Sequence, residues 1–336
     1  MERITIIGVG PIGASIGLGL MRRKLNNTEI VISSGDRKVM DTVSKIGAAD
    51  STDGNLRSAV SGAQLVVIDT QIGELHELLE AIGPILDSGA VVTDTSATKT
   101  PVLRWAKQYL RTGASYVGGR PLTKRIPHSV ESADPTIFAG ANYTVTPAKD
   151  ADESSINTVI GLIEALGAHP LFLDPSEHDS YAAAMHYLPI VMASAFVTTT
   201  AGSDGWREMH QLADEGFDRY SHLAANDPMD NEAYCLANPE ALVHWLDQII
   251  LELYSYRNDI AEGKSELLEK FVDAWEMRAR WEADAVVPKG GAILPSARDS
   301  MATAFFGQKL ADRLHSNDDD KKEQQLKYSR RSGPPA

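Results

Sequence analysis

Three glycines and one acidic residue near the start have the spacing of a dinucleotide-binding turn. An apolar segment at 3–7 is followed by Gly8-Val9-Gly10-Pro11-Ile12-Gly13, and the next residues, 14–21, have the pattern of an apolar helix. A second predicted strand at 29–32 leads to Asp36, 23 positions after the last glycine. The first glycine permits a tight turn, the second lets a pyrophosphate approach the backbone, and the third lets helix and strand pack closely.

The ligand that this turn predicts is NAD. The helix N-terminus offers free N–H groups and a partial positive charge to a pyrophosphate. Asp36 is placed to accept hydrogen bonds from a ribose 2′-OH, which favours NAD, but the neighbouring Arg37 could approach a 2′-phosphate, so NADP stays open. A glycine-rich turn in an unrelated α/β unit, or a Rossmann domain without cofactor, are the alternatives. The residues expected to bind the cofactor are Gly8, Gly10, Pro11, Ile12, Gly13, Asp36, Arg37 and Thr70.

Composition limits the classes of protein. The length of 336 residues suggests two domains, and 43% hydrophobic residues are enough for real cores. A formal net charge of −14 argues against nucleic acid and anionic membranes as partners. Because Cys235 is the only cysteine, an intramolecular disulfide and a cysteine-based metal site are excluded. The histidines also lack the spacing of metal ligands. With no expected signal peptide and no apolar run of membrane-spanning length, a cytoplasmic location is the expectation.

The elements that must position these residues change in character along the chain. Up to 174, predicted strands and helices alternate, which indicates a mostly parallel sheet. From 175 to about 315 the pattern is helical, with long helices at 180–200, 241–262 and 265–286. We therefore predict an α/β Rossmann-type N-terminal domain (1–174), an all-helical C-terminal domain for substrate and dimerisation (175–315), and a disordered tail (316–336). The long Ala- and Met-rich helix favours a helical dimer interface.

Several further segments resemble the prephenate and arogenate dehydrogenases over most of residues 1–260. The segments that carry the resemblance are GVGPIGASIGLGL, VVTDTSATK, YVGGRPL, SVESADPTIFAGANYTVTP, EHDSYAAAMHYLP and GFDRYSHLAANDP, with Asn238 downstream. The resemblance implies oxidation of a ring alcohol by hydride transfer to NAD(P)+, with loss of the ring carboxylate as CO2, in tyrosine biosynthesis. Such chemistry requires a group that takes the hydroxyl proton, and cationic or polar groups that hold two carboxylates.

The chain departs from the family pattern at the substrate half of the site. The family's Gly-Gly-His-Pro is Gly118-Gly119-Arg120-Pro121 here, and an arginine cannot act as a neutral base. The family's serine after the fifth strand is Ala97, although Ser96 or Thr98 could supply a hydroxyl. Ser-His-Leu-Pro-His becomes His186-Tyr187-Leu188-Pro189-Ile190, so both histidines are displaced or lost.

These departures define the candidate site residues. We expect Ser96, Arg120 and His186 to be catalytic, and Lys124, Arg125, Tyr187 and His222 to bind substrate. Arg120, Lys124, Arg125 and His128 form a basic run that could bind a carboxylate or phosphate. A solvated basic loop and a core histidine at 186 are the structural alternatives. The pair His178-Asp179 is interpreted as structural, an acid favoured by the dipole of its own helix.

Three functions are compatible with this sequence. The leading hypothesis is a cytoplasmic, homodimeric, NAD(P)-dependent dehydrogenase of the prephenate dehydrogenase type. The second is a divergent member that acts on another small anionic substrate in specialised metabolism, which the changed motifs favour. The third is a catalytically silent nucleotide-binding protein, against which the intact glycine turn argues.

Overall fold

The computed structural model describes residues 2–125 and 127–283. It divides into two compact units, Met1–Gln248 and Ile249–Ala336, of which the second is described only as far as residue 283. The predicted tail at 316–336 lies outside the described residues. The boundary expected at 174 falls inside the first unit and stays a prediction.

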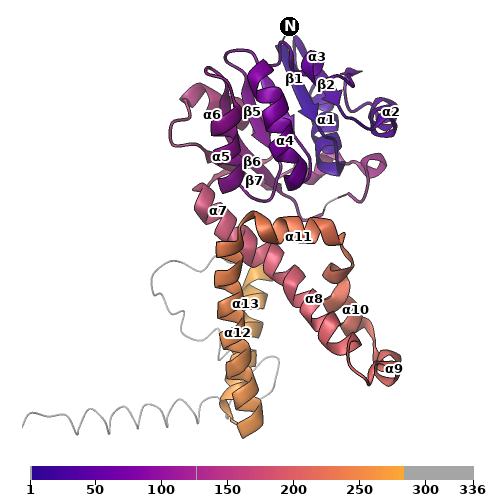
Figure 1. The fold of residues 1–336 in the computed structure, drawn as a ribbon, viewed down its shortest axis with the longest axis vertical. Coiled ribbons are helices and arrows are strands. Elements are labelled where there is room, and N and C mark those ends of the chain that lie inside the picture. Colours follow the sequence, from indigo (N-terminus) through magenta and orange to yellow (C-terminus); the bar gives the residue numbers. More distant parts are fainter. Residues whose placement is uncertain (1, 126, 284–336) are drawn as a thin grey trace, which may run out of the picture. The chain divides into compact units, whose positions relative to one another are not determined.

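An eight-stranded sheet forms the centre of the first unit (Figure 1). Its order is β3-β2-β1-β4-β5-β6-β7-β8, with β1 to β6 parallel, β7 antiparallel to β6, and β8 parallel to β7. This confirms the predicted Rossmann-type, mostly parallel sheet. The strands are β1 (Glu2–Ile7), β2 (Thr28–Ser33), β3 (Ser51–Thr52), β4 (Leu65–Ile68), β5 (Val91–Asp94), β6 (Ser115–Leu122), β7 (Asn142–Pro147) and β8 (His169–Phe172).

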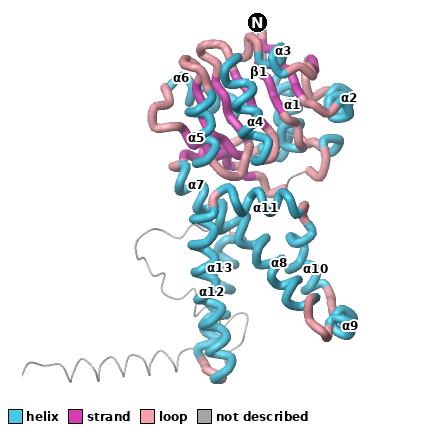
Figure 2. The backbone as a smooth tube through the Cα atoms, viewed as in Figure 1, coloured by secondary structure: helices cyan, strands magenta, loops and turns pink. Residues whose placement is uncertain are grey.

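Helices cover both faces of this sheet, as Figure 2 shows. Successive strand residues point to opposite faces, so a strand with consecutive apolar residues buries side chains on both. Ile6 packs in one apolar cluster and its neighbour Ile7 in the other. The first cluster is completed by α1 (Pro11–Arg23), α2 (Arg37–Ile46), α6 (Glu153–Ala165) and the short helices η2 (Val130–Ser132) and η3 (Pro135–Phe138). The second is completed by α3 (Leu56–Val60), α4 (Ile72–Ile82), η1 (Gly83–Ile85) and α5 (Thr100–Tyr109).

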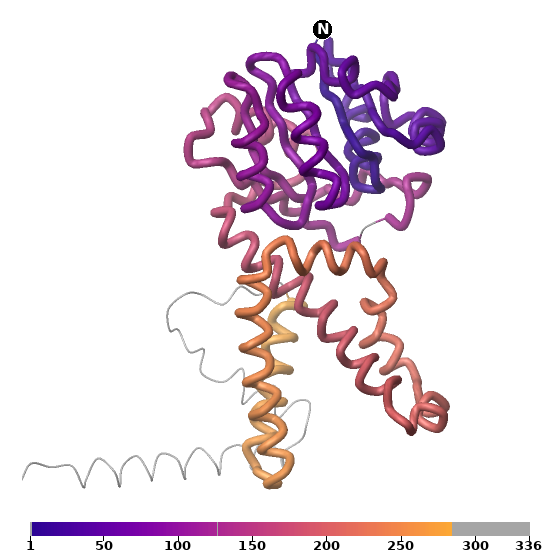
Figure 3. Tube along the Cα trace, in the orientation of Figure 1, coloured from indigo at the N-terminus to yellow at the C-terminus, as the bar shows by residue number. Residues whose placement is uncertain are grey.

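From residue 175 onward, the described residues are helical and contain no strand. The chain leaves the sheet at α7 (Pro175–Ala182) and continues through the π-helical turn η4 (Ala183–Tyr187) into α8 (Leu188–Ala201), as Figure 3 shows. This confirms the predicted helical C-terminal part. The remaining helices are α9 (Trp206–Met209), η5 (His210–Leu212), α10 (Glu215–Ser221), η6 (His222–Ala225), α11 (Pro228–Ala237), α12 (Pro239–Glu262) and α13 (Glu266–Glu282).

The expectation that no apolar run reaches membrane-spanning length is wrong for one segment. α7, η4 and α8 form one continuous helix of 27 residues, Pro175–Ala201, and an 18-residue window within it has a mean hydropathy of 1.3, which is enough by length and composition alone to cross a membrane. Only 28% of its most apolar window is buried. Length and composition alone do not distinguish a membrane span from a helix that packs against another protein chain.

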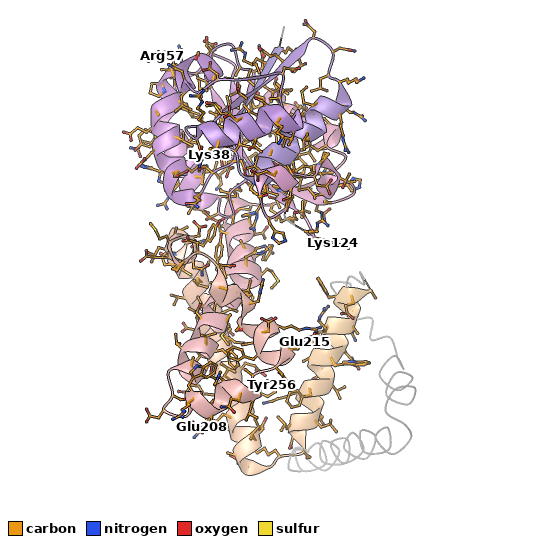
Figure 4. All side chains as sticks on the ribbon, turned by 90° about the vertical axis from the view of Figure 1, so that its right-hand side faces the viewer. Lys38, Arg57, Lys124, Glu208, Glu215 and Tyr256 are labelled. Atoms are coloured by element: carbon orange, nitrogen blue, oxygen red, sulfur yellow. The ribbon has the colours of Figure 1, made fainter. Side chains whose placement is uncertain are left out.

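The second unit contains the end of α12 and all of α13, joined by side-chain contacts. Lys270 forms an ion pair with Asp259 at 2.5 Å and lies 5.0 Å from the ring centroid of Tyr256. The Tyr256 ring, labelled in Figure 4, also packs against Phe271 with 5.5 Å between centroids. These contacts hold α13 against the last turns of α12.

Candidate active site

The glycine turn has the backbone geometry that the sequence predicts. Gly8 has a φ of +66°, in the left-handed region, and its N–H donates to the Ser33 carbonyl at 3.0 Å. Gly10 is the N-cap of α1, and Pro11 occupies the first turn. A Cβ on Gly13 would lie 2.7 Å from Oδ2 and 2.9 Å from the Cβ of Asp69, both closer than real Cβ contacts. The turn between β1 and α1 therefore requires glycine at its first and last positions.

Asp69, which directly follows β4, occupies the donors of this turn. Its Oδ2 accepts hydrogen bonds from the N–H groups of Gly10 at 2.9 Å and Gly13 at 2.6 Å, and its Oδ1 accepts from the Thr95 hydroxyl at 2.5 Å. Burial raises the pKa of the Asp69 carboxyl above its ordinary value, although the three donors act in the opposite direction. Sequence analysis missed this residue. The available signal was an acid at the end of a buried parallel strand, the edge where such sheets bind ligands.

The other predicted cofactor residues lie at the same edge of the sheet. Asp36 follows β2, is exposed, and caps α2 by accepting the Lys38 N–H at 2.7 Å. Arg37 beside it is exposed as well. Thr70 follows Asp69 and donates its hydroxyl to Glu74 in the first turn of α4. Ile12 lies in the first turn of α1 and is half-buried.

A buried ion pair supports the substrate half of the site. Lys99 and Asp94 are both 0% exposed, with 2.6 Å between Nζ and Oδ2. Lys99 also donates to the Gly119 carbonyl at 2.6 Å, and the Tyr116 hydroxyl donates to Asp94 at 2.5 Å. Burial lowers the pKa of Lys99, while the nearby carboxylate of Asp94 acts to raise it. The pair thus ties the end of β5 to the strand that carries Arg120.

Ser96 belongs to this buried network. Its hydroxyl donates to Asp94 and lies 2.8 Å from the Thr98 carbonyl oxygen, and Lys99 Nζ lies 3.4 Å from it. In the described chain the hydroxyl has no contact with Arg120 or His186. These hydrogen bonds stabilise the turn after β5, and a catalytic role for Ser96 stays a prediction.

Arg120 is a half-buried cation without a paired carboxylate among the described residues. It lies on β6 opposite Thr144 of β7, and its guanidinium donates one hydrogen bond, to the Ala97 carbonyl at 3.4 Å. Burial lowers the pKa of the guanidinium, but an arginine remains charged at neutral pH. The preceding residues, Gly118 and Gly119, are closely packed, since a Cβ on either would lie within 3.0 Å of a neighbouring side chain.

Tyr187 and His186 reach this region from the π-helical turn η4. The Tyr187 hydroxyl donates to the Ala97 carbonyl at 2.8 Å, and its ring stacks on Tyr234 of α11 with 5.7 Å between centroids. Partial desolvation and the positive charge of Arg120 lower the pKa of His186, although the residue is exposed. A π-helical turn shifts side-chain direction within a helix and is frequent at functional sites. Tyr234 was not predicted from the sequence.

The pair His178-Asp179 is structural, but it acts on a different helix from the one expected. The buried Asp179 carboxylate accepts the N–H groups of Lys99 at 2.6 Å and Thr100 at 2.7 Å, at the start of α5. His178 Nδ1 lies 3.1 Å from the same carboxylate. The acid therefore stabilises the N-terminus of α5, not that of its own helix α7.

The remaining predicted substrate residues lie apart from Arg120. Lys124 and Arg125 are exposed in the loop after β6, and Figure 4 shows Lys124 at the periphery of the sheet-containing part. Arg125 pairs with Asp134 at 3.6 Å. His222 is exposed in η6, which packs on α8. The residues of the basic run thus differ in burial, because Arg120 is half-buried on a strand while Lys124 and Arg125 are exposed in the loop that follows.

A glycine turn at the carboxyl edge of a Rossmann-type sheet, together with a half-buried cation on β6 and a histidine and a tyrosine on η4, fits a nucleotide-dependent dehydrogenase. The chain matches the prephenate dehydrogenase nucleotide-binding domain over residues 18–171 and the prephenate dehydrogenase dimerization domain over residues 174–274. It belongs to the prephenate dehydrogenase family and is an NAD-dependent dehydrogenase of that family.

Individual relatives are distant in sequence, but they match most of the chain. The chain is 25% identical over 272 residues to prephenate dehydrogenase of Bacillus subtilis, covering 80% of this chain and 73% of that protein. It is 28% identical over 280 residues to prephenate dehydrogenase of Lactococcus lactis, covering 81% and 75%. A crystal structure of prephenate dehydrogenase from A. aeolicus, in complex with hydroxyphenyl propionate and NAD+, has a TM-score of 0.77 at 21% identity and covers 83% and 98%. That structure supports the fold.

Proposed function

We propose that this protein oxidises prephenate, arogenate or a close ring-carboxylate analogue with NAD, in the biosynthesis of tyrosine or a related aromatic compound. The observation that carries the proposal is Arg120, a half-buried guanidinium that has no ion-pair partner among the described residues. A desolvated cation of this kind binds a carboxylate strongly, and its planar fork suits two oxygens. The curated relatives act as prephenate dehydrogenases, which supplies the substrate class.

The residues present fit the cofactor at the glycine turn. The left-handed Gly8 and the Cβ-free Gly10 and Gly13 leave the backbone open at the N-terminus of α1, and Asp36 lies at the end of β2 for a ribose hydroxyl. NAD bound there would supply the hydride acceptor. The cofactor fits only if the carboxylate of Asp69 first releases the N–H groups of Gly10 and Gly13.

The chain's own groups then have separable tasks. Arg120 binds a substrate carboxylate. The imidazole of His186 is neutral at physiological pH because its pKa is lowered, so its free nitrogen accepts the proton of the substrate hydroxyl. The phenol of Tyr187 stays protonated, since burial raises its pKa, and it holds the Ala97 carbonyl in place. Ser96, Lys99 and Asp94 position the strand below.

A second candidate is a dehydrogenase of the same family that acts on a different small anion. Arg120, in place of the histidine of the family pattern, favours this candidate because it adds a positive charge where the resemblance implies a base. Lys124, Arg125 and His222 remain proposed substrate contacts only for a larger or more highly charged substrate, because they are exposed.

We further propose a cytoplasmic homodimer that forms through the helical part. The matched family domain is a dimerization domain, and several large apolar side chains on the helices are exposed. Tyr254, Leu251, Met277 and Trp281 are all at least 60% exposed, which a second copy would cover. Light scattering after size exclusion should give twice the chain mass of 36.4 kDa.

The enzymatic proposal is tested by following NADH formation with prephenate, with arogenate and with a panel of carboxylate-bearing alcohols. We expect turnover with one of the ring carboxylates. In Arg120→Ala, KM should rise roughly 10- to 100-fold, the equivalent of losing one charge-assisted hydrogen-bonded pair, while Arg120→Lys should recover part of the loss. No NADH with prephenate or arogenate, but turnover with another acid, would select the second candidate. No NADH with any of them would refute both.

A further inference from the structure

Asp69 holds the place where the cofactor's pyrophosphate would bind. The first-turn N–H groups of a helix are unsatisfied donors that favour an anion. In α1 two of the turn's donors, on Gly10 and Gly13, are already bonded to Asp69 Oδ2, at 2.9 Å and 2.6 Å. The same oxygen lies 3.1 Å from where a Cβ on Gly10 would be. The carboxylate therefore fills the space that the glycines leave open.

No cation compensates this carboxylate among the described residues. Its third donor is the neutral Thr95 hydroxyl at 2.5 Å, and Asp69 forms no ion pair in the described part of the chain. A pyrophosphate at the turn would thus place like charges side by side in a partly buried site, where screening by water is weak. The two anions cannot share the donors of Gly10 and Gly13.

We propose that Asp69 is an internal competitor of the cofactor, which must leave the glycine turn before the pyrophosphate binds and so sets the affinity for NAD. The proposal rests on the proposed dinucleotide-binding function. It differs from a purely structural role, in which the carboxylate would stabilise the turn in the conformation that the cofactor needs. The two roles predict opposite changes in NAD affinity, because removing a competitor strengthens binding and removing a stabilising group weakens it.

The test is calorimetric titration of the wild-type dimer or monomer, as purified, with NAD+, ADP-ribose and adenosine. Asp69→Asn keeps the shape of the side chain and removes its charge, and Asp69→Ala removes both. Asp87→Asn is the matched control, since Asp87 also accepts a glycine N–H, that of Gly62 at 2.8 Å, away from the turn. Circular dichroism and thermal unfolding establish that each variant is folded.

We expect both Asp69 variants to bind NAD+ and ADP-ribose roughly 10- to 100-fold more tightly than wild type, because two charge-assisted hydrogen bonds no longer have to be broken. Adenosine, which lacks the pyrophosphate, should bind all proteins alike, and Asp87→Asn should match wild type. Variants that bind NAD+ while wild type does not would also support the proposal. Unchanged or weaker NAD+ binding in folded Asp69→Asn would overturn it while leaving the dehydrogenase function intact. Absence of binding in every protein would overturn both.

Discussion

Replacing Lys99 with methionine should destabilise the sheet-containing unit by about 3 kcal/mol. Methionine keeps most of the apolar stem and removes the ammonium, which lies 2.6 Å from the carboxylate of Asp94 in a fully buried pair. Breaking one side of such a pair typically costs about 3–5 kcal/mol, because a buried charge remains. Asp94 keeps donors from Tyr116, Ser96 and Gly119, which places the expectation at the lower end of that range.

The assay is equilibrium unfolding in urea, followed by far-ultraviolet circular dichroism, with a thermal melt alongside. A loss of about 3 kcal/mol corresponds to a drop in Tm of roughly 6–12 °C for a unit of this size. Asp94→Asn and the double variant complete a double-mutant cycle. Since the double variant leaves no uncompensated charge, it should be more stable than the sum of the single losses predicts, by about 1–3 kcal/mol.

Two results would refute the reasoning. A loss below about 1 kcal/mol for Lys99→Met would mean that the buried carboxylate is satisfied without the ammonium. Strict additivity in the cycle would mean that Lys99 and Asp94 do not interact in the folded protein, whatever the distance between them.

Three further outcomes are expected. Because the pKa of His186 is lowered, kcat/KM should show no acid limb near pH 6.5, and His186→Asn should lower kcat by roughly 10²–10⁴-fold; a limb at 6.5 that persists in the variant would assign the proton to another group. Burial raises the pKa of Asp69, so its carboxylate is protonated at a higher pH than an ordinary aspartate, and lowering the pH should tighten NAD binding in wild type but not in Asp69→Asn. The facing phenols of Tyr143 and Tyr234, whose pKa values are also raised, stay neutral over this range. Equal pH profiles of the two proteins would contradict this prediction. Asp36→Ala should weaken NAD binding roughly tenfold, measured against Asp36→Asn, which keeps an oxygen for the cap of α2; unchanged affinity in both would remove the ribose assignment.

The prediction that no apolar run is long enough to span a membrane is wrong at the helix Pro175–Ala201. The sequence predicts one long helix at 180–200, and the structure begins that helix earlier, at Pro175, and continues it through a π-helical turn to Ala201. The residue types of that turn do not predict a π-helix. In the fold, Tyr187 at its end stacks on Tyr234 and donates to the Ala97 carbonyl, which are contacts between distant parts of the chain.

Local features were accessible to sequence reasoning. The glycine turn, the strand before it and the helix after it are contiguous, and the turn needs a left-handed residue at Gly8 wherever the rest of the chain lies. The alternation of strands with helices up to residue 174 follows from periodicity in the same way. The glycine turn and the place of Asp36 after its strand were therefore accessible from the sequence alone, whereas Asp69, which comes from a distant strand, was not.

Only the tertiary structure decided which distant groups meet. Asp69 lies 59 positions from Gly10, Asp179 lies 80 positions from Lys99, and Tyr187 lies 90 positions from Ala97, yet each pair shares a hydrogen bond. The basic run differs in burial along its length, because Arg120 lies on β6 and is half-buried whereas Lys124 follows in an exposed loop. Parallel strands bring residues far apart in sequence to one edge, so the partners of each charge depend on strand order, which no local pattern encodes.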